Sequence, residues 1–90
     1  MQDEISLLLQ DTSPVDHSLL IGIGAFSKHT TEKVKLDQVL FELRKCLKES
    51  VLIDSVAELY RKNYIKCYGL YEFVSLTEKG LYLSNFFYKK

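Results

Sequence analysis

Residues 52–76, LIDSVAELYRKNYIKCYGLYEFVSL, contain the change of pattern that decides the fold. In the first half, apolar residues recur at helical intervals: Leu52, Ile53, Val56, Leu59 and Tyr60. This spacing predicts an amphipathic helix over Ser50–Lys62 with that stripe packed inward. In the second half, aromatic and β-branched residues lie on both sides of Gly69-Leu70, which is typical of two strands joined by a tight turn. The chain therefore passes from a helix into a predicted β-hairpin.

The predicted hairpin consists of strands over Tyr64–Tyr68 and Tyr71–Leu76. The pair between them, Gly69-Leu70, is typical of a two-residue type II′ turn, because glycine readily adopts the positive φ of its first position. Asn63 precedes the first strand, where we expect the left-handed residue that ends many helices. Thr77 follows the second strand and is expected to cap a last helix, whose apolar face would consist of Leu81, Leu83, Phe86 and Phe87.

A helix is also predicted over residues 14–27, and its beginning is well marked. Ser13 is suited to the N-cap, Pro14 to the first helical position and Asp16 to the positive end of the helix dipole. Its apolar positions are Val15, Leu19, Ile23 and Phe26. Each of Gly22 and Gly24 costs up to about 1 kcal/mol inside a helix unless another element packs closely. We therefore interpret these two glycines as sites of close helix packing.

The polar segment Lys28–Lys35 is predicted to be a loop or a very short strand. A further helix is predicted over Leu36–Lys48, because its apolar residues share one stripe: Leu36, Val39, Leu40, Leu43 and Leu47. Residues 1–12, with the apolar run Ile5–Leu9, are expected to form a separate N-terminal segment, helical or partly disordered. Residues 13–90 are expected to form one domain, since so short a chain supports a single core.

The composition is that of an ordinary globular protein, with 47% hydrophobic and 27% charged residues. The longest apolar run, Leu19–Phe26, is far shorter than the roughly 20 residues that cross a bilayer. Asp3 and Glu4 occupy the place where a secretory signal carries positive charge. Cys46 and Cys67 are widely separated in apolar patterns, and we interpret both as reduced thiols. We therefore expect a cytoplasmic protein without a membrane segment.

The residues that catalysis or metal binding requires are not grouped in this sequence. His17 and His29 are twelve positions apart, with no carboxylate or cysteine at a spacing typical of metal ligands. Gly22 and Gly24 lack the third glycine or the basic residue of a nucleotide-binding loop. No serine, threonine or cysteine stands in a recognisable nucleophile motif. We expect a protein that is not an enzyme and that holds no metal ion or other cofactor.

Two segments resemble the winged helix-turn-helix superfamily, in particular transcriptional regulators of the MarR and PadR type. Residues 56–65, VAELYRKNYI, resemble the end of a recognition helix that runs into the first wing strand. Residues 76–80, LTEKG, resemble the passage from the second wing strand into the next helix. The resemblance extends over residues 36–87 and implies an α+β, mainly helical fold with a three-helix core, a two-stranded hairpin wing and a C-terminal helix. It also implies that Ser50–Lys62 lies in or near the major groove of duplex DNA, braced by Leu36–Lys48.

Local charge identifies the residues of the predicted DNA interface. Residues 1–16 carry four carboxylates and no Lys or Arg, whereas residues 44–66 carry six cations and three carboxylates. Cations on both sides of the groove would neutralise phosphates, although cations also gather at helix C-termini because they complement the dipole. The candidate DNA-binding residues are Arg44, Lys45, Lys48, Ser50, Asp54, Ser55, Arg61, Lys62 and Lys66. Asp54 is included because a carboxylate accepts a hydrogen bond from cytosine, and Ser50 is favoured as the cap of its helix.

A second hypothesis, without DNA, follows from the neutral net charge and from a hairpin tip that contains no arginine. Nine of the eleven aromatic residues lie between Tyr60 and Tyr88, and tyrosine-rich surfaces are typical of protein interfaces. The predicted partner interface consists of Tyr68, Tyr71, Tyr82, Phe86 and Tyr88, with Ile5–Leu9 as a further apolar contribution. The sequence thus predicts a homodimeric, DNA-binding transcriptional regulator. The alternative is a winged-helix module for protein interaction or assembly that does not bind DNA.

Overall fold

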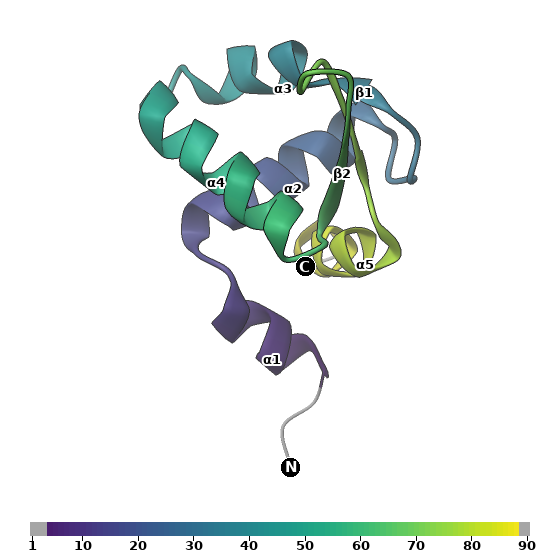
Figure 1. Cartoon of the computed structure of the whole chain (residues 1–90). Helices are drawn as coiled ribbons and strands as arrows, with labels where there is room; N and C mark the ends of the chain where they lie inside the picture. The colour runs from purple at the N-terminus through teal and green to yellow at the C-terminus, as the bar shows by residue number, and fades with distance from the viewer. Residues whose placement is uncertain (1–3, 89–90) are drawn as a thin grey trace.

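A computed structural model describes residues 4–88, which contain five α-helices and one three-stranded antiparallel sheet (Figure 1). In chain order the elements are α1 (Glu4–Asp11), α2 (Pro14–Phe26), β1 (Val34–Lys35), α3 (Leu36–Leu43), α4 (Glu49–Arg61), β2 (Ile65–Tyr68), β3 (Phe73–Leu76) and α5 (Glu78–Tyr88). The fold is α+β and mainly helical, which confirms the predicted class at that level. None of the helices in the described residues has the length and apolar composition to cross a membrane.

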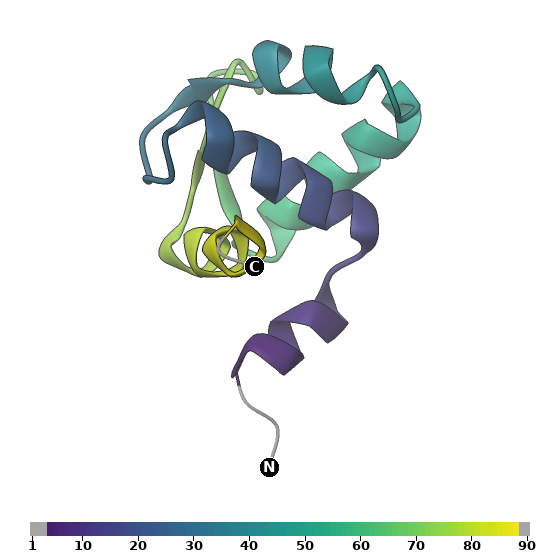
Figure 2. The same ribbon diagram turned by 180° about the vertical axis from the view of Figure 1, so that it is seen from behind.

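Helix α2 is the centre of the packing, since it contacts α3, α4, α5 and β3. Figure 2 shows α2 running across the molecule, with α3 on one side and α5 on the other. Leu19 and Ile23 are fully buried, as predicted, whereas Phe26 at the end of the helix is exposed beside α3. The glycines act as expected: a Cβ on Gly24 would lie only 2.4 Å from the Ser84 hydroxyl of α5.

The predicted N-terminal cap of α2 is confirmed. The Ser13 hydroxyl accepts a hydrogen bond of 3.1 Å from the backbone nitrogen of Asp16, and the Asp16 carboxylate accepts one of 3.0 Å from the backbone nitrogen of Ser13. Pro14 occupies the first turn, where its missing N–H leaves no hydrogen bond unmade. This reciprocal pair fixes the position at which the chain enters α2.

Helices α3 and α4 are divided differently from the prediction. Helix α3 ends at Leu43, not at Lys48, because residues 44–47 form turns that are held by backbone bonds to Leu43 and its neighbour. Helix α4 begins at Glu49, and its N-cap is Lys48, whose side chain makes no capping bond. Ser50 is therefore not the cap, and it lies exposed in the first turn. The C-terminal prediction for α4 is confirmed, since Asn63 has a φ of 68°.

The hairpin has a four-residue connection, and the predicted two-residue type II′ turn is wrong. Tyr68 pairs with Phe73, and the backbone nitrogen of Glu72 donates to the Tyr68 carbonyl at 3.1 Å. Gly69 has the expected positive φ, but Tyr71 adopts a φ of 63° as well, which lengthens the loop. Strand β1 adds a third strand, paired with β3 through Val34 and Val74. The segment Lys28–Lys35 thus ends in the very short strand that was one of its two predicted forms.

Helix α1 packs against the domain, in contact with α5. Ile5, Leu8 and Leu9 are half-buried against the hydrophobic core. Ile5, Leu8 and Leu9 therefore bury part of their apolar surface within their own chain, and the contribution of Ile5–Leu9 to a partner interface stays a prediction. The order of residues 1–3, which the N-terminal prediction also included, lies outside the described residues.

Helix α5 begins where the sequence predicts, because the Thr77 hydroxyl accepts a hydrogen bond of 3.1 Å from the backbone nitrogen of Gly80. The first turn of α5 lies directly on the connection between α4 and β2, and a Cβ on Gly80 would approach the Tyr64 carbonyl oxygen to 2.0 Å. Backbone atoms on both sides of this contact leave no room for a side chain. Glycine at this position is thus required by packing.

We predict that Gly80→Ala lowers the free energy of unfolding by about 3 kcal/mol, because the added methyl group must displace backbone. Gly22→Ala is the matched control, since its Cβ would meet only side-chain atoms, of Val39 at 3.1 Å and of Leu43 at 3.7 Å. The control should change stability by no more than about 1 kcal/mol, because alanine also favours the helix. Urea unfolding of both variants measures this difference, and equal effects would contradict the packing contact.

Candidate interaction face on α4 and the hairpin

Helix α4 buries Leu52, Val56 and Leu59, as predicted from the spacing. The prediction that Ile53 and Tyr60 are also packed inward is wrong, since each is 49% exposed. Both lie at the edge of the buried stripe that is turned toward the hairpin. The exposed side of α4 beside the hairpin is therefore partly apolar, and it continues through Ala57 to the exposed charges of Asp54 and Arg61.

The hairpin tip extends this apolar surface. The Tyr71 ring meets the Tyr60 ring edge-on, with ring centroids 6.3 Å apart. Beside it lies a hollow of about 240 Å³, lined by Leu36, Ile53, Val56, Ala57 and Tyr71. Leu70, next to Tyr71, is 98% exposed. We call the surface formed by Ile53, Ala57, Tyr60, Leu70 and Tyr71 the α4–hairpin face.

Sequence reasoning missed most of this face. Ile53 and Tyr60 had an apolar spacing that fitted the buried stripe, and only the position of the hairpin shows that they lie at its edge. Leu70 carried the one available signal, because an apolar side chain in a tight turn has nowhere to be buried. Of the predicted partner residues, only Tyr71 belongs to the α4–hairpin face.

Most of the predicted DNA-binding cations are already neutralised by carboxylates of the same chain. Arg44 is paired with Glu49, Lys45 with Glu42 at 3.1 Å, and Arg61 with Glu58 at 2.8 Å. The hydrogen bond from Arg61 is the main reason that the pKa of Glu58 lies below its ordinary value. Each such pair reduces the positive charge that would release counterions from DNA. Lys48 and Lys66 are exposed, and no ion pair of either is found within residues 4–88.

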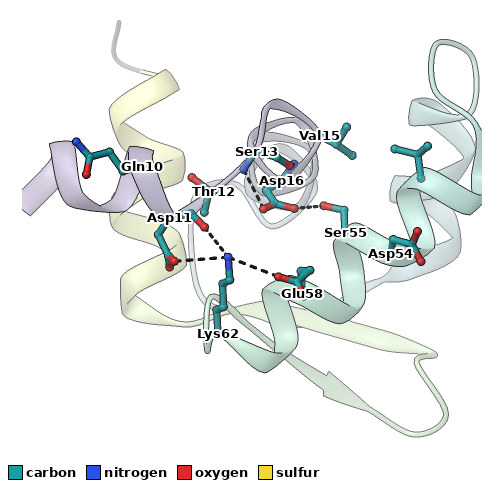
Figure 3. A pocket seen from close by; sticks show the side chains of 11 residues that line it. Gln10, Asp11, Thr12, Ser13, Val15, Asp16, Asp54, Ser55, Glu58 and Lys62 are labelled. Carbon is teal, nitrogen blue, oxygen red and sulfur yellow. Dashed lines mark hydrogen bonds and ion pairs between the residues drawn. The ribbon is translucent and has the colours of Figure 1, made fainter.

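Lys62 does not point toward the side of α4 that was predicted to face DNA. It points into a cleft of about 490 Å³ between α4 and the junction of α1 with α2 (Figure 3). Its ammonium group donates to the Asp11 carbonyl at 2.7 Å and lies 3.5 Å from both the Asp11 and Glu58 carboxylates. The Tyr64 hydroxyl donates to the same Asp11 carboxylate at 3.0 Å. Burial, with this bond, raises the pKa of Tyr64. Lys62 is thus a link between α4 and the N-terminal segment.

Ser55 is buried, with 4% of its surface exposed, so its prediction as a DNA contact is wrong. Its hydroxyl donates to one carboxylate oxygen of Asp16, while the other oxygen accepts from the backbone of Ser13. Figure 3 shows the two side chains meeting between α2 and α4. The hydroxyl satisfies a carboxylate that is itself 95% buried, since Asp16 is only 5% exposed. The role of Ser55 is therefore to join two helices.

We predict that Ser55→Ala lowers the free energy of unfolding by about 1–3 kcal/mol, because it leaves a buried carboxylate without one of its donors. Ser50→Ala, at an exposed position of the same helix, should change it by less than about 0.5 kcal/mol. Chemical denaturation of the two variants measures both effects. A Ser55→Ala variant as stable as the unchanged protein would show that the bond contributes nothing.

The five aromatic residues predicted to form one partner interface lie at two separate places. Tyr71 is at the hairpin tip, whereas Tyr82, Phe86 and Tyr88 are on α5, at the opposite end of the hairpin (Figure 1). Tyr68, within β2, is half-buried and shares a hydrogen bond of 3.2 Å with Ser75. The length of strands β2 and β3 separates Tyr71 from the aromatic residues of α5, so the five side chains do not form one continuous surface.

His17 connects the start of α2 to α5, with its ring centroid 4.6 Å from that of Phe87. The Thr12 hydroxyl donates to the Leu8 carbonyl at 2.8 Å, so it accepts from His17 Nε2, which lies 2.6 Å away. Nδ1 is then the nitrogen that gains the second proton. Burial lowers the pKa of His17, and this effect outweighs the opposing influence of Asp16.

We predict that the protein is less stable at about pH 5.5 than at about pH 7.5. The folded chain favours neutral His17, so this contribution is complete above the ordinary pKa of 6.5 and is lost as pH falls toward the lowered pKa. In His17→Gln the pH difference should shrink, as measured by urea unfolding at both pH values. An unchanged difference in the variant would assign the pH dependence to other groups.

Within residues 4–88, no three His, Cys, Asp or Glu side chains are grouped closely enough to hold a metal ion. Cys46 is exposed in the turn after α3, and Cys67 in β2 is half-buried, which raises the pKa of its thiol. No protein-family model, curated protein or solved structure matches the chain.

Proposed function

We propose that this chain is a winged-helix module that binds protein, not duplex DNA, through its α4–hairpin face. Helices α2, α3 and α4 then correspond to the three-helix core, β2 and β3 to the wing, and α5 to the C-terminal helix. The order of these elements supports this correspondence, as does the position of the hairpin beside α4. The resemblance to MarR and PadR regulators then concerns the fold and not the ligand.

The observation that carries the proposal is the character of the α4 surface beside the hairpin. Ile53, Tyr60, Leu70 and Tyr71 are large apolar side chains that are about half exposed or more. Ile53 and Tyr71 line one hollow, Tyr60 meets the Tyr71 ring, and Leu70 is next to Tyr71 in the hairpin loop. Exposed apolar groups of this kind are typical of protein interfaces. Interfaces with DNA are instead polar and strongly positive.

The charges around this face oppose DNA binding as well. Asp54 is exposed on the outward side of α4, and Glu49 and Glu58 occupy both ends of the same helix. Counterion release requires cations that are free to neutralise phosphates. Four of the six cations in the predicted DNA-binding set are held by carboxylates. These ion pairs would have to be broken before the four cations could bind phosphate. Duplex DNA is therefore the less favoured ligand.

We predict that the protein does not bind a labelled random duplex at micromolar concentration in about 20 mM salt, where non-specific binding is strongest. Fluorescence anisotropy measures this binding. The matched variant Glu49→Gln/Glu58→Gln frees Arg44 and Arg61, so weak binding that falls steeply with added salt should appear in it.

DNA binding by the unchanged protein would contradict the proposal. If the unchanged protein binds the duplex at this concentration and Lys48→Ala/Lys66→Ala weakens that binding, the start of α4 or strand β2 contacts DNA and the proposal is wrong. The double lysine variant should fold normally, because both side chains are exposed.

A further inference from the structure

We infer that the partner of the α4–hairpin face is a second copy of this chain, with the two α4 helices antiparallel about a two-fold axis that passes near Ala57. This inference rests on the proposed function, because it names the protein that the face binds. A closed dimer requires a surface that is complementary to itself under a two-fold rotation. The charges and the apolar groups of the face both meet this requirement.

The charges of Asp54 and Arg61 on α4 favour an antiparallel pairing. Asp54, Ala57 and Arg61 are spaced three and four residues apart, so they form one line along the exposed side of α4. When a second α4 runs antiparallel about a point midway along this line, each Asp54 faces the partner's Arg61. The dimer thus gains two opposite-charge pairs from one line of residues. A parallel arrangement in the same register would instead place each charge beside its own copy.

The small side chain of Ala57 lies between the two charges, close to the proposed axis. Small residues allow helices to approach closely, and Ala57 is exposed and free of the long side chains that would hold two helices apart. Arg61 also retains donors for a partner. Its Nη2 binds both carboxylate oxygens of Glu58, at 2.9 and 2.8 Å, and a guanidinium group has five N–H donors in all.

The apolar groups supply the second argument. Ile53, Tyr60, Leu70 and Tyr71 all lie on the hairpin side of the charged line. A two-fold axis that is perpendicular to α4 and lies in the plane of contact leaves the hairpins of both copies on the same side of the helix pair. The apolar groups of one copy therefore meet those of the other. Leu70, which is 98% exposed in the single chain, is covered in this arrangement. Burial of an apolar surface beside pairs of opposite charge is a common construction of a specific interface.

The test uses charge reversal in the full chain. Asp54→Arg places Arg beside the partner's Arg61, and Arg61→Asp places Asp beside the partner's Asp54, so each single variant should raise the dimer dissociation constant at least about tenfold. The two single variants carry opposite charges on this line, so an equimolar mixture should form a heterodimer. Sedimentation velocity measures the dissociation constants, and native mass spectrometry identifies the mixed species. The double variant Asp54→Arg/Arg61→Asp should also dimerise again.

Two further variants separate the interface from effects on folding. Leu70→Ser removes an apolar side chain that makes few contacts within the chain, so it should weaken the dimer while the thermal unfolding of the single chain is unchanged. Lys45→Glu is the matched control, because it reverses another exposed, paired cation that lies off the α4 line. This control should dimerise like the unchanged protein.

The inference is overturned if the unchanged chain is monomeric at several hundred micromolar, or if its dimer is insensitive to Leu70→Ser and to both charge reversals. It is also overturned if only Tyr82→Asp, on α5, dissociates the dimer. A monomer that also ignores DNA refutes the self-pairing and leaves a different protein as the partner. Duplex binding by α4 refutes the proposed function itself, so the two failures are distinguishable.

Discussion

The buried carboxylate of Asp16 is the interaction on which the rest of the structure depends. One of its oxygens completes the cap of α2, and the other accepts the Ser55 hydroxyl from α4. A carboxylate that is 95% buried is tolerated only when its oxygens are bonded, so the two helices must keep the relative position that satisfies both bonds. The residue that caps α2 therefore also fixes the position of α4 relative to α2.

This constraint determines which side of α4 faces outward. With Ser55 turned toward α2, Lys62 on the same side of the helix reaches the Asp11 carbonyl, and the opposite edge presents Ile53 and Tyr60 to the hairpin. Two polar residues of the predicted DNA interface, Ser55 and Lys62, are thus bonded within the fold, while the apolar Ile53 and Tyr60 remain exposed. A helix whose sequence resembles a recognition helix therefore has a different outer surface from the one that its residue types indicate.

The sequence was most informative where structure is local. The caps formed by Ser13 and Thr77 were predictable because donor and acceptor lie three residues apart, and helices α2 and α4 followed from apolar spacing. The features that were missed depend on distant contacts. Ser55 is 39 residues from its carboxylate, and the hairpin loop is lengthened by Tyr71, whose ring packs against α4. Whether a side chain faces solvent, and hence most of the candidate site, is decided at this longer range.

The attachment of α1 has a consequence for synthesis on the ribosome. Asp11, the last residue of α1, is bound by Lys62 and Tyr64, which are 51 and 53 positions later in the chain. Helix α1 is synthesised before these tertiary partners, so it cannot form these bonds until more than 50 further residues have been added. Ile5, Leu8 and Leu9 are therefore accessible to chaperones in the nascent chain, and their burial marks the completion of the fold.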